Sequence, residues 1–164
     1  EEEVPQGEKG ELWVRGPQIA KGYLNDPETT KNTFSNGWLR TGDIAVRDED
    51  GILTIVDRKK DMLIYNGYNV YPRYLEELLY EHEAVQSCVV LGVPDDRAGE
   101  IPKAFVVLKS GATAALKDIQ EFVNSRVVHY SKIREIEQLD ALPMTAAGKI
   151  SRIALQKLEA SKSN

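Results

Sequence analysis

The chain has 164 residues, of which 41% are hydrophobic and 29% are charged, and its formal net charge is −5 at pH 7. This composition is typical of a folded chain of one or two domains and excludes a disordered or fibrous protein. The balance of 26 acidic against 21 basic side chains argues against bulk nucleic-acid binding, which needs a basic field.

The first part of the chain, residues 1–56, predicts short strands separated by turns. Residues 11–15 alternate between apolar and polar types and are bounded by glycines, which is typical of a strand. Pro27 favours the first turn of a short helix. The acidic turn at residues 48–51 predicts a hairpin between two β-rich runs, because its glycine tolerates a positive φ.

The second part, residues 62–164, follows a charged run at residues 57–61 and has longer elements. The pair Asn66-Gly67 between two apolar runs predicts a β-hairpin. Helical periodicity predicts three helices, beginning at Pro72, near a Thr113 cap and near Ser151. Further strands are predicted at residues 85–93, 104–108 and 133–139.

This order of elements predicts an α+β fold, with a three-stranded sheet, flanking helices and a separate β-hairpin in the second part. The single cysteine, Cys88, lies in an apolar run and is expected to be inert in the core. We also interpret Trp13 and Tyr23 as core aromatics. No apolar stretch approaches the roughly 18 residues that a membrane-spanning helix needs. We therefore expect no transmembrane segment.

Four segments are not explained by packing alone. They are residues 10–30 with Gly10, Gly22-Tyr23 and Pro27, residues 37–43 (GWLRTGD), residues 57–72 (DRKKD to GYNVYP), and residues 142–149 (LPMTAAGK). In this order and at these separations they resemble the last conserved blocks of the adenylate-forming (AMP-binding) enzymes. This superfamily includes acyl-CoA synthetases, luciferases and peptide-synthetase adenylation domains. The amino-acid sequence of the third segment is most similar to that of acyl-CoA synthetases, among them the long-chain fatty-acid–CoA ligases.

The resemblance covers residues 10–152 and implies a domain organisation. Residues 1–56 would be the β-rich end of a large N-terminal domain, residues 57–61 a hinge, and residues 62–164 a small C-terminal lid domain. The implied reaction joins a carboxylic acid, in our interpretation a fatty acid, to CoA. The acid first reacts with ATP to give an acyl adenylate and pyrophosphate, and the CoA thiol then displaces AMP. Magnesium (Mg) would be bound mainly by the N-terminal part.

The resemblance also implies roles for five residues. Lys149 corresponds to the catalytic lysine of adenylation, because an ammonium can bridge a carboxylate and a phosphate as charge builds between them. Asp43 and Arg58 correspond to the nucleotide-binding residues, with Asp43 accepting hydrogen bonds from ribose hydroxyls. Lys60 matches the hinge position. Gly67 lies at the tip of the hairpin that would line the CoA channel. No metal ligand is assigned.

Each of these assignments has a simpler alternative. Lys149 could be a solvated surface lysine, and Asp43 could cap its own turn after Gly42. Arg58 could form a surface ion pair with Asp57 or Asp61. Residues 57–61 could be an ordinary linker, and the Asn-Gly hairpin needs no ligand to explain it. The order and spacing of the four segments favour the functional interpretation for Lys149 and Asp43.

The sequence as given is expected to be a piece of a longer enzyme. It does not begin with Met, and it lacks a glycine- and serine/threonine-rich phosphate-binding loop. We therefore expect these residues to be inactive alone. Two other functions stay open, an adenylation domain that loads a carrier protein and a non-catalytic binding module. The expected compartment is the cytoplasm, with peripheral membrane association of the parent left open.

Overall fold

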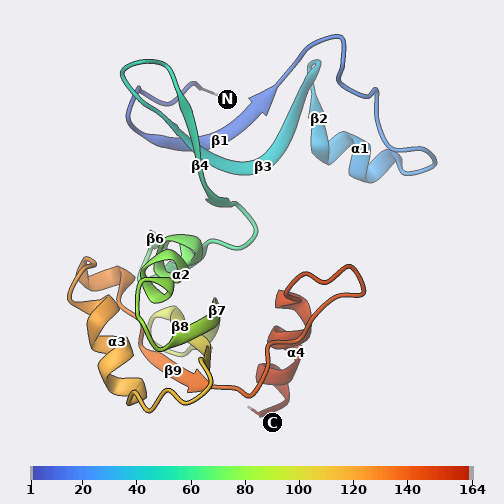
Figure 1. The fold of residues 1–164 in the computed structure, drawn as a ribbon. Helices are drawn as coiled ribbons and strands as arrows, with labels where there is room; N and C mark the ends of the chain where they lie inside the picture. Colours follow the sequence, from blue (N-terminus) through green and yellow to red (C-terminus); the bar gives the residue numbers. More distant parts are fainter. Residues whose placement is uncertain (1, 163–164) are drawn as a thin grey trace. The chain divides into compact units, whose positions relative to one another are not determined.

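The computed structural model describes residues 2–162, and the chain divides into two compact units, Glu1–Lys60 and Asp61–Asn164. The first unit is coloured blue to green in Figure 1, and the second green to red. Within the described residues, no helix has the length and apolar character to cross a membrane. Each unit is described by itself below.

The first unit is an antiparallel sheet with one short helix. Its elements are β1 (Lys9–Val14), α1 (Pro27–Thr33), β2 (Phe34–Ser35), β3 (Trp38–Arg47) and β4 (Leu53–Arg58). Strand β3 pairs with β1, β2 and β4. The predicted helix at Pro27 is confirmed, and the Asp26 carboxylate caps it by accepting the Thr29 N–H at 2.9 Å. The predicted hairpin turn is also confirmed, since Asp48 Oδ1 accepts the Ile52 N–H at 2.8 Å.

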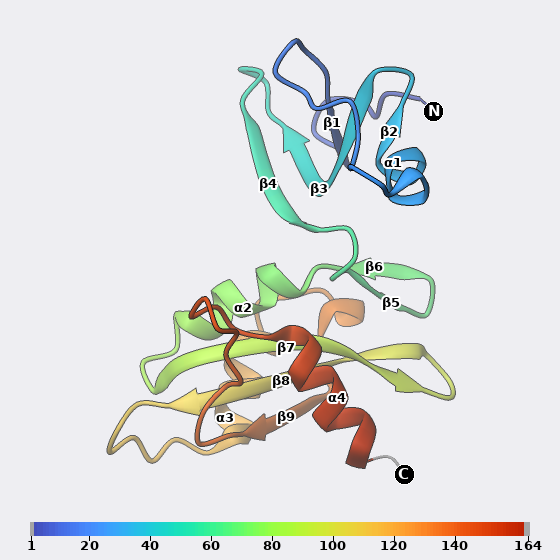
Figure 2. The ribbon, with the colours of Figure 1, turned by 90° about the vertical axis from the view of Figure 1, so that its right-hand side faces the viewer.

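The second unit is a five-stranded sheet with helices on both faces (Figure 2). Its elements are β5 (Leu63–Tyr65), β6 (Tyr68–Val70), α2 (Pro72–Tyr80), β7 (Val85–Asp95), β8 (Gly99–Leu108), α3 (Leu116–Asn124), a 3-10 helix (His129–Ser131), β9 (Glu135–Gln138) and α4 (Arg152–Lys162). The α+β prediction is confirmed. The predicted hairpin β5–β6 does not stand apart, however, because Tyr65 pairs with Gly99 and extends the sheet.

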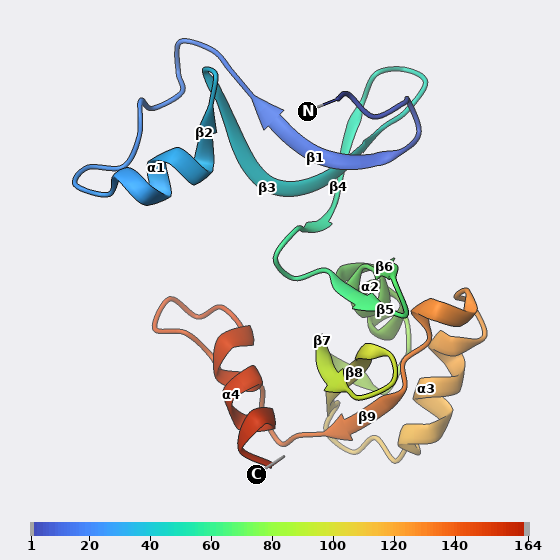
Figure 3. The same cartoon turned by 180° about the vertical axis from the view of Figure 1, so that it is seen from behind.

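Strands β7 and β8 are apolar on both sides because each side meets a helix. Cys88 and Val90 pack towards α2 and α3 in one hydrophobic cluster. Val89 and Leu91, on the opposite side of the same strand, pack with residues of α4 and the segment before it. Figure 3 shows the sheet between α3 and α4. This two-sided burial explains why the sequence has a continuous apolar run here.

Two predicted details of this unit have clear outcomes. Burial raises the pKa of the Cys88 thiol to about 12, which confirms an inert core cysteine. The predicted Thr113 cap is wrong, since Ala115 precedes α3 and offers no side-chain cap. The Ser151 cap of α4 is confirmed, because its Oγ accepts the Ala154 N–H at 3.2 Å.

Candidate functional site

Asp43 and Arg58 lie opposite each other on β3 and β4 of the first unit. Arg58 Nη1 donates to Asp43 Oδ1 at 2.6 Å. The Arg58 side chain therefore pairs with Asp43 and not with the alternative partners, Asp57 and Asp61. Asp57 instead accepts the Arg58 backbone N–H at 2.7 Å and is only 4% exposed. The sequence-predicted nucleotide pair is brought together on one sheet surface.

The backbone beside Asp43 is irregular. Gly42 has φ +71° in the middle of β3, which a residue with a side chain would adopt at a cost. Thr41 Oγ1 accepts the Asp43 N–H at 3.0 Å and donates to Leu12 O at 2.8 Å. Asp43 is thus a strand residue whose N–H is capped by Thr41, and its carboxylate does not cap its own turn.

A hollow of about 540 Å³ opens beside this ion pair within the first unit. Its lining includes Tyr23, Arg40, Thr41 and Arg58. Tyr23 is 52% exposed and meets Phe34 edge-on, with ring centroids 6.0 Å apart, so its interpretation as a core aromatic is wrong. Asp43 is not among the lining residues, and the carboxylate that lines the hollow is that of Glu11. An aromatic wall and the guanidinium groups of Arg40 and Arg58 around one hollow can hold a polar, anionic, ring-bearing ligand.

The boundary between the two units falls directly after Lys60. Lys60 is exposed, whereas the preceding Lys59 is held in the first unit by Glu11, whose Oε2 lies 2.8 Å from Lys59 Nζ. The Lys59 N–H also donates to Gly42 O at 2.8 Å. The ordered sheet contacts therefore reach Lys59, and the predicted hinge position is the first residue beyond them.

The hairpin that carries Gly67 turns through two residues in the left-handed region. Asn66 has φ +48° and Gly67 φ +81°, the geometry that an Asn-Gly turn favours. The Asn66 N–H donates to Ala98 O at 2.9 Å, which ties the hairpin to the β7–β8 turn, directly before β8 begins at Gly99. Next to the tip, Tyr68 is 56% exposed and stacks on Tyr130 with ring centroids 4.7 Å apart.

Lys149 lies in a small closed loop before α4. Thr145 N–H donates to Lys149 O at 2.7 Å, and Gly148 N–H donates to Thr145 O at 2.9 Å. Gly148 has φ +73°, which lets the chain reverse there. Lys149 is exposed, and within residues 2–162 no carboxylate lies in ion-pair contact with its Nζ. The cation is thus held on an ordered turn and left available.

Possible metal ligands do not cluster in the part of the chain that the structure describes. Among residues 2–162, His, Cys, Asp and Glu side chains form no group of three or more that could hold a metal ion. Asp43 and Arg58 belong to the first unit, Lys60 ends it, and Gly67 and Lys149 belong to the second.

Comparison with known proteins agrees with the resemblance of the four sequence segments, which are residues 10–30, 37–43, 57–72 and 142–149. Residues 74–149 match the AMP-binding enzyme C-terminal domain. Residues 74–149 therefore carry the C-terminal domain of AMP-binding enzymes, and the chain is similar to the C-terminal part of adenylate-forming enzymes, as the sequence predicted.

Within this superfamily the chain is similar to CoA ligases. It is 51% identical over 152 residues to a long-chain-fatty-acid–CoA ligase of Bacillus subtilis (strain 168), which covers 93% of this chain and 27% of that protein. It is 45% identical over 150 residues to 4-coumarate–CoA ligase 1 of Petroselinum crispum, covering 91% of this chain and 28% of that one. The chain thus spans little more than a quarter of the length of these relatives.

Solved structures agree with this family. ATP-bound MatB from Rhodopseudomonas palustris superposes with a TM-score of 0.90 at 31% identity, covering 98% of this chain and 32% of that one. The amide bond synthetase McbA from Marinactinospora thermotolerans gives a TM-score of 0.87 at 39% identity, covering 94% and 32%. The two units therefore match parts of larger adenylate-forming enzymes.

Proposed function

We propose that this chain is the C-terminal part of an ATP-dependent acyl-CoA synthetase that acts on a fatty acid. The whole enzyme would convert acid, ATP and CoA to acyl-CoA, AMP and pyrophosphate through an acyl adenylate. The observation that carries the proposal is the division of the site residues, because the Asp43–Arg58 pair and the exposed Lys149 lie in different units separated at Lys60. Similarity to a long-chain-fatty-acid–CoA ligase supports the substrate class.

In this proposal Lys149 promotes the first step. Attack of a carboxylate on the α-phosphate brings two anions together, so the barrier is largely electrostatic. An ammonium without a carboxylate partner can approach both anions, and a closed loop keeps it ordered. A half-reaction assay distinguishes this role of Lys149 from that of a plain surface lysine.

Asp43 and Arg58 would hold the nucleotide. Their ion pair uses Oδ1 of Asp43 and Nη1 of Arg58. The second carboxylate oxygen can accept a ribose hydroxyl, and the other guanidinium N–H groups can donate to a phosphate or to the ribose. ATP and CoA are the co-substrates, and we expect magnesium to be held by parts of the enzyme outside these residues. The cytoplasm remains our expected compartment because ATP and CoA are both consumed.

Lys60 would be the pivot between the two reaction steps, and the Gly67 hairpin would enter the thioester-forming site. A pivot needs free rotation about φ and ψ at one residue, and proline removes rotation about φ. Lys60→Pro in the whole enzyme should leave pyrophosphate release with acid and ATP within about twofold and stall thioester formation. Lys59→Pro is not a suitable control because the Lys59 N–H is bonded; Lys9→Ala, in β1, is. An unaffected overall rate in Lys60→Pro would count against the hinge.

The proposed function is tested with the whole protein that contains this chain. Pyrophosphate release is measured with ATP and carboxylic acids of increasing length, and product formation is then measured with CoA, a carrier protein or an amine as the acceptor. The amine is included because McbA is an amide bond synthetase. Selective turnover of fatty acids with CoA supports the proposal. Selective transfer to a carrier protein or an amine, or no pyrophosphate release with any acid, overturns it.

A further inference from the structure

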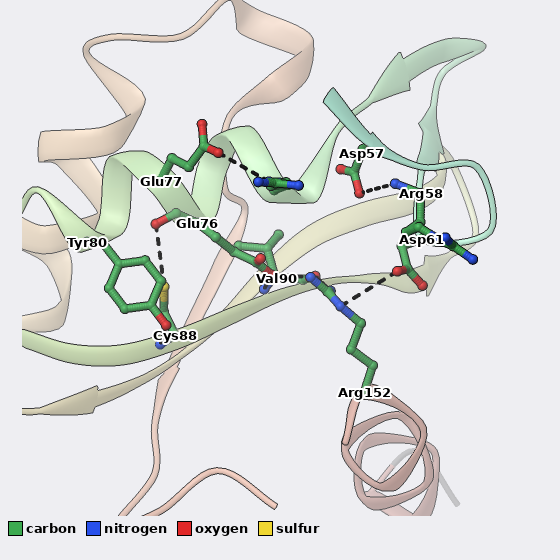
Figure 4. Close-up of polar contacts among 10 residues, drawn as sticks. Asp57, Arg58, Asp61, Glu76, Glu77, Tyr80, Cys88, Val90 and Arg152 are labelled. Carbon is green, nitrogen blue, oxygen red and sulfur yellow. Dashed lines mark hydrogen bonds and ion pairs between the residues drawn. The ribbon is translucent and has the colours of Figure 1, made fainter. Parts of the chain in front are cut away.

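Arg152 is the first residue of α4 and follows Lys149 by three positions. Its guanidinium reaches back to the sheet, as Figure 4 shows. Nη1 donates to Val90 O at 2.8 Å, and Nη2 donates to Glu76 Oε1 at 2.6 Å. Nε lies 3.9 Å from Asp61 Oδ2, the first residue of the second unit. One side chain thus joins the start of α4 to β7, α2 and the segment after the boundary.

The contacts of Arg152 form a closed hydrogen-bonded group with Glu76 and Val90. Glu76 Oε1 accepts both Arg152 Nη2 and the Val90 N–H, the latter at 2.8 Å. Within residues 2–162, β7 has β8 as its only strand partner, so the outward N–H and C=O of Val90 are edge groups. Glu76 accepts the hydrogen bond from the Val90 N–H, and Arg152 donates one to the Val90 C=O. The Glu76 side chain is 14% exposed and that of Arg152 24%, which strengthens these charge-assisted bonds.

The position of Arg152 on its helix is unfavourable without these partners. The N-terminus of a helix carries a partial positive charge, so a cation in the first turn is disfavoured. The first turn of α4 has no acidic residue of its own to offset this. The partly buried carboxylate of Glu76, on another helix, supplies the compensation. The arginine is therefore better explained by the contact that it makes than by helix stability.

The group around Arg152 fixes the base of the loop that presents Lys149. The loop is closed by its own bonds, including Ser151 N–H to Pro143 O at 2.8 Å. Leu142 and Ile150 pack beside it in the cluster under α4. Those apolar contacts resist separation but set direction poorly, whereas a bidentate guanidinium sets both distance and angle. Arg152, three positions after Lys149, makes the directional contacts that join the base of this loop to β7 and α2.

We propose that Arg152 is a positioning residue for the Lys149 loop, acting through Glu76 and the Val90 backbone, and this inference rests on the proposed adenylation role of Lys149. Without the anchor the loop would still form, but its base would tilt and Lys149 would occupy a wider range of positions. A misplacement of about 1 Å can cost about 10²-fold in rate. The loss should fall on acyl-adenylate formation, the step that needs Lys149, and leave thioester formation from supplied acyl adenylate within about threefold.

The variants are Arg152→Ala, Arg152→Lys and Glu76→Gln in the whole enzyme, with Arg73→Ala as matched control. Arg73 belongs to an exposed ion pair with Glu77 on the same helix as Glu76. Arg152→Ala should lower adenylation by about 10²-fold. Arg152→Lys should restore part of it, because lysine keeps the charge but cannot donate from a planar fork. Glu76→Gln should lower the adenylation rate less than Arg152→Ala does. The double variant should lower it no more than Arg152→Ala alone, because the two residues act through one contact. Arg73→Ala should leave the adenylation rate unchanged.

Amide hydrogen exchange of residues 143–151 tests the anchor without any chemistry. Loss of a charge-assisted hydrogen bond should speed exchange there by about tenfold in Arg152→Ala and leave the β5–β6 hairpin unchanged. Unchanged loop exchange, or equal loss of both half-reactions, overturns the positioning role. Absence of pyrophosphate release in the wild-type protein overturns the proposed function instead, so the two failures are distinguishable. If Arg152→Ala does not fold, Arg152→Lys and Glu76→Gln give the same comparison in milder form.

Discussion

Two lysines of the second unit have opposite surroundings, since one is paired with carboxylates of the fold and the other has no ion pair within the described residues. Lys103, on β8, is 8% exposed and forms ion pairs with Glu135, Glu137 and Glu159. Lys149 is exposed on a loop, and no described residue neutralises it. The ammonium group of Lys103 is thus paired with three carboxylates, whereas that of Lys149 forms no ion pair within the described residues.

The Lys103 cluster joins β8, β9 and the end of α4. Burial disfavours the charged form of Lys103, but hydrogen bonds to Glu159 and Glu137 outweigh burial and raise its pKa. Lys162 adds a second cation at 3.3 Å from Glu159. The helix after the Lys149 loop is therefore held at its end by this cluster and at its start by Arg152. Lys149, the proposed catalytic cation, therefore precedes a helix that is held at both ends.

The largest effect expected from this contrast is the loss of Lys149. Lys149→Ala should lower acyl-adenylate formation in the whole enzyme by about 10²–10³-fold, the value for removing one group that stabilises developing charge. Thioester formation from supplied acyl adenylate and the free energy of unfolding should change little, because the side chain makes no ion pair within the described chain. Pyrophosphate release and single-turnover thioester formation are the measurements. Equal loss in both half-reactions would refute the assignment.

The next largest effect is a loss of stability, with little change in the rates of the two half-reactions. Lys103→Met should lower the free energy of unfolding of the second unit by about 2 kcal/mol, since it leaves three carboxylates without their shared cation. The value lies below that for a fully buried pair because Glu135 is 51% exposed. The change in this free energy is measured from the urea midpoint of unfolding, followed by pulse proteolysis at cleavage sites within residues 61–164.

The control for Lys103 is Lys157→Met, an exposed position on α4. It removes the same charge from the same unit without breaking the cluster, so its midpoint should stay close to the wild-type value. Equal midpoints for the two variants would mean that the Lys103 cluster is solvated in solution and contributes no more than a surface lysine.

Most of the fold could be predicted from the sequence, because its signals are local. The Asn66-Gly67 turn, the helix at Pro72 and the Ser151 cap depend on a few neighbouring residues, and all three are observed. The attachment of the hairpin to the sheet was missed because it depends on a pairing of Tyr65 with Gly99, far away in the sequence. Thr113 failed as a cap because the helix begins later, at Leu116.

The candidate site shows the same limit. The resemblance named Asp43 and Arg58 separately, but only the sheet register reveals that they face each other. Arg152 was missed because Glu76 and Val90 are 76 and 62 positions away. One signal was present in the sequence, namely a cation in the first turn of a helix without an acidic neighbour. It indicates an unseen partner but does not identify it.

The smallest effect concerns pH and sharpens the account of the Lys103 cluster. The hydrogen bond from Lys162, and after it that from Lys103, holds the pKa of Glu137 below its ordinary value of 4.5 despite partial burial. A lowered folded-state pKa means that the unfolded chain binds more protons below pH 4.5. The stability from Glu137 is therefore fully present above that pH and is lost as the pH falls through the lowered value. Glu137→Gln should be less stable than the wild type at pH 7, and the gap should shrink by pH 3.

Urea midpoints at pH 7, 5 and 3 measure this difference, with Glu121→Gln on the exposed side of α3 as the control. Glu121 has no cation of the cluster beside it, so its replacement should shift the midpoint little and equally at each pH. A gap for Glu137→Gln that stays constant from pH 7 to pH 3 would show that its charge contributes nothing and that the replacement acts through packing alone. A gap that closes only between pH 5 and 3 would place the protonation where the lowered pKa requires it, and would identify the Lys103 cluster as an acid-sensitive attachment of α4 to the sheet.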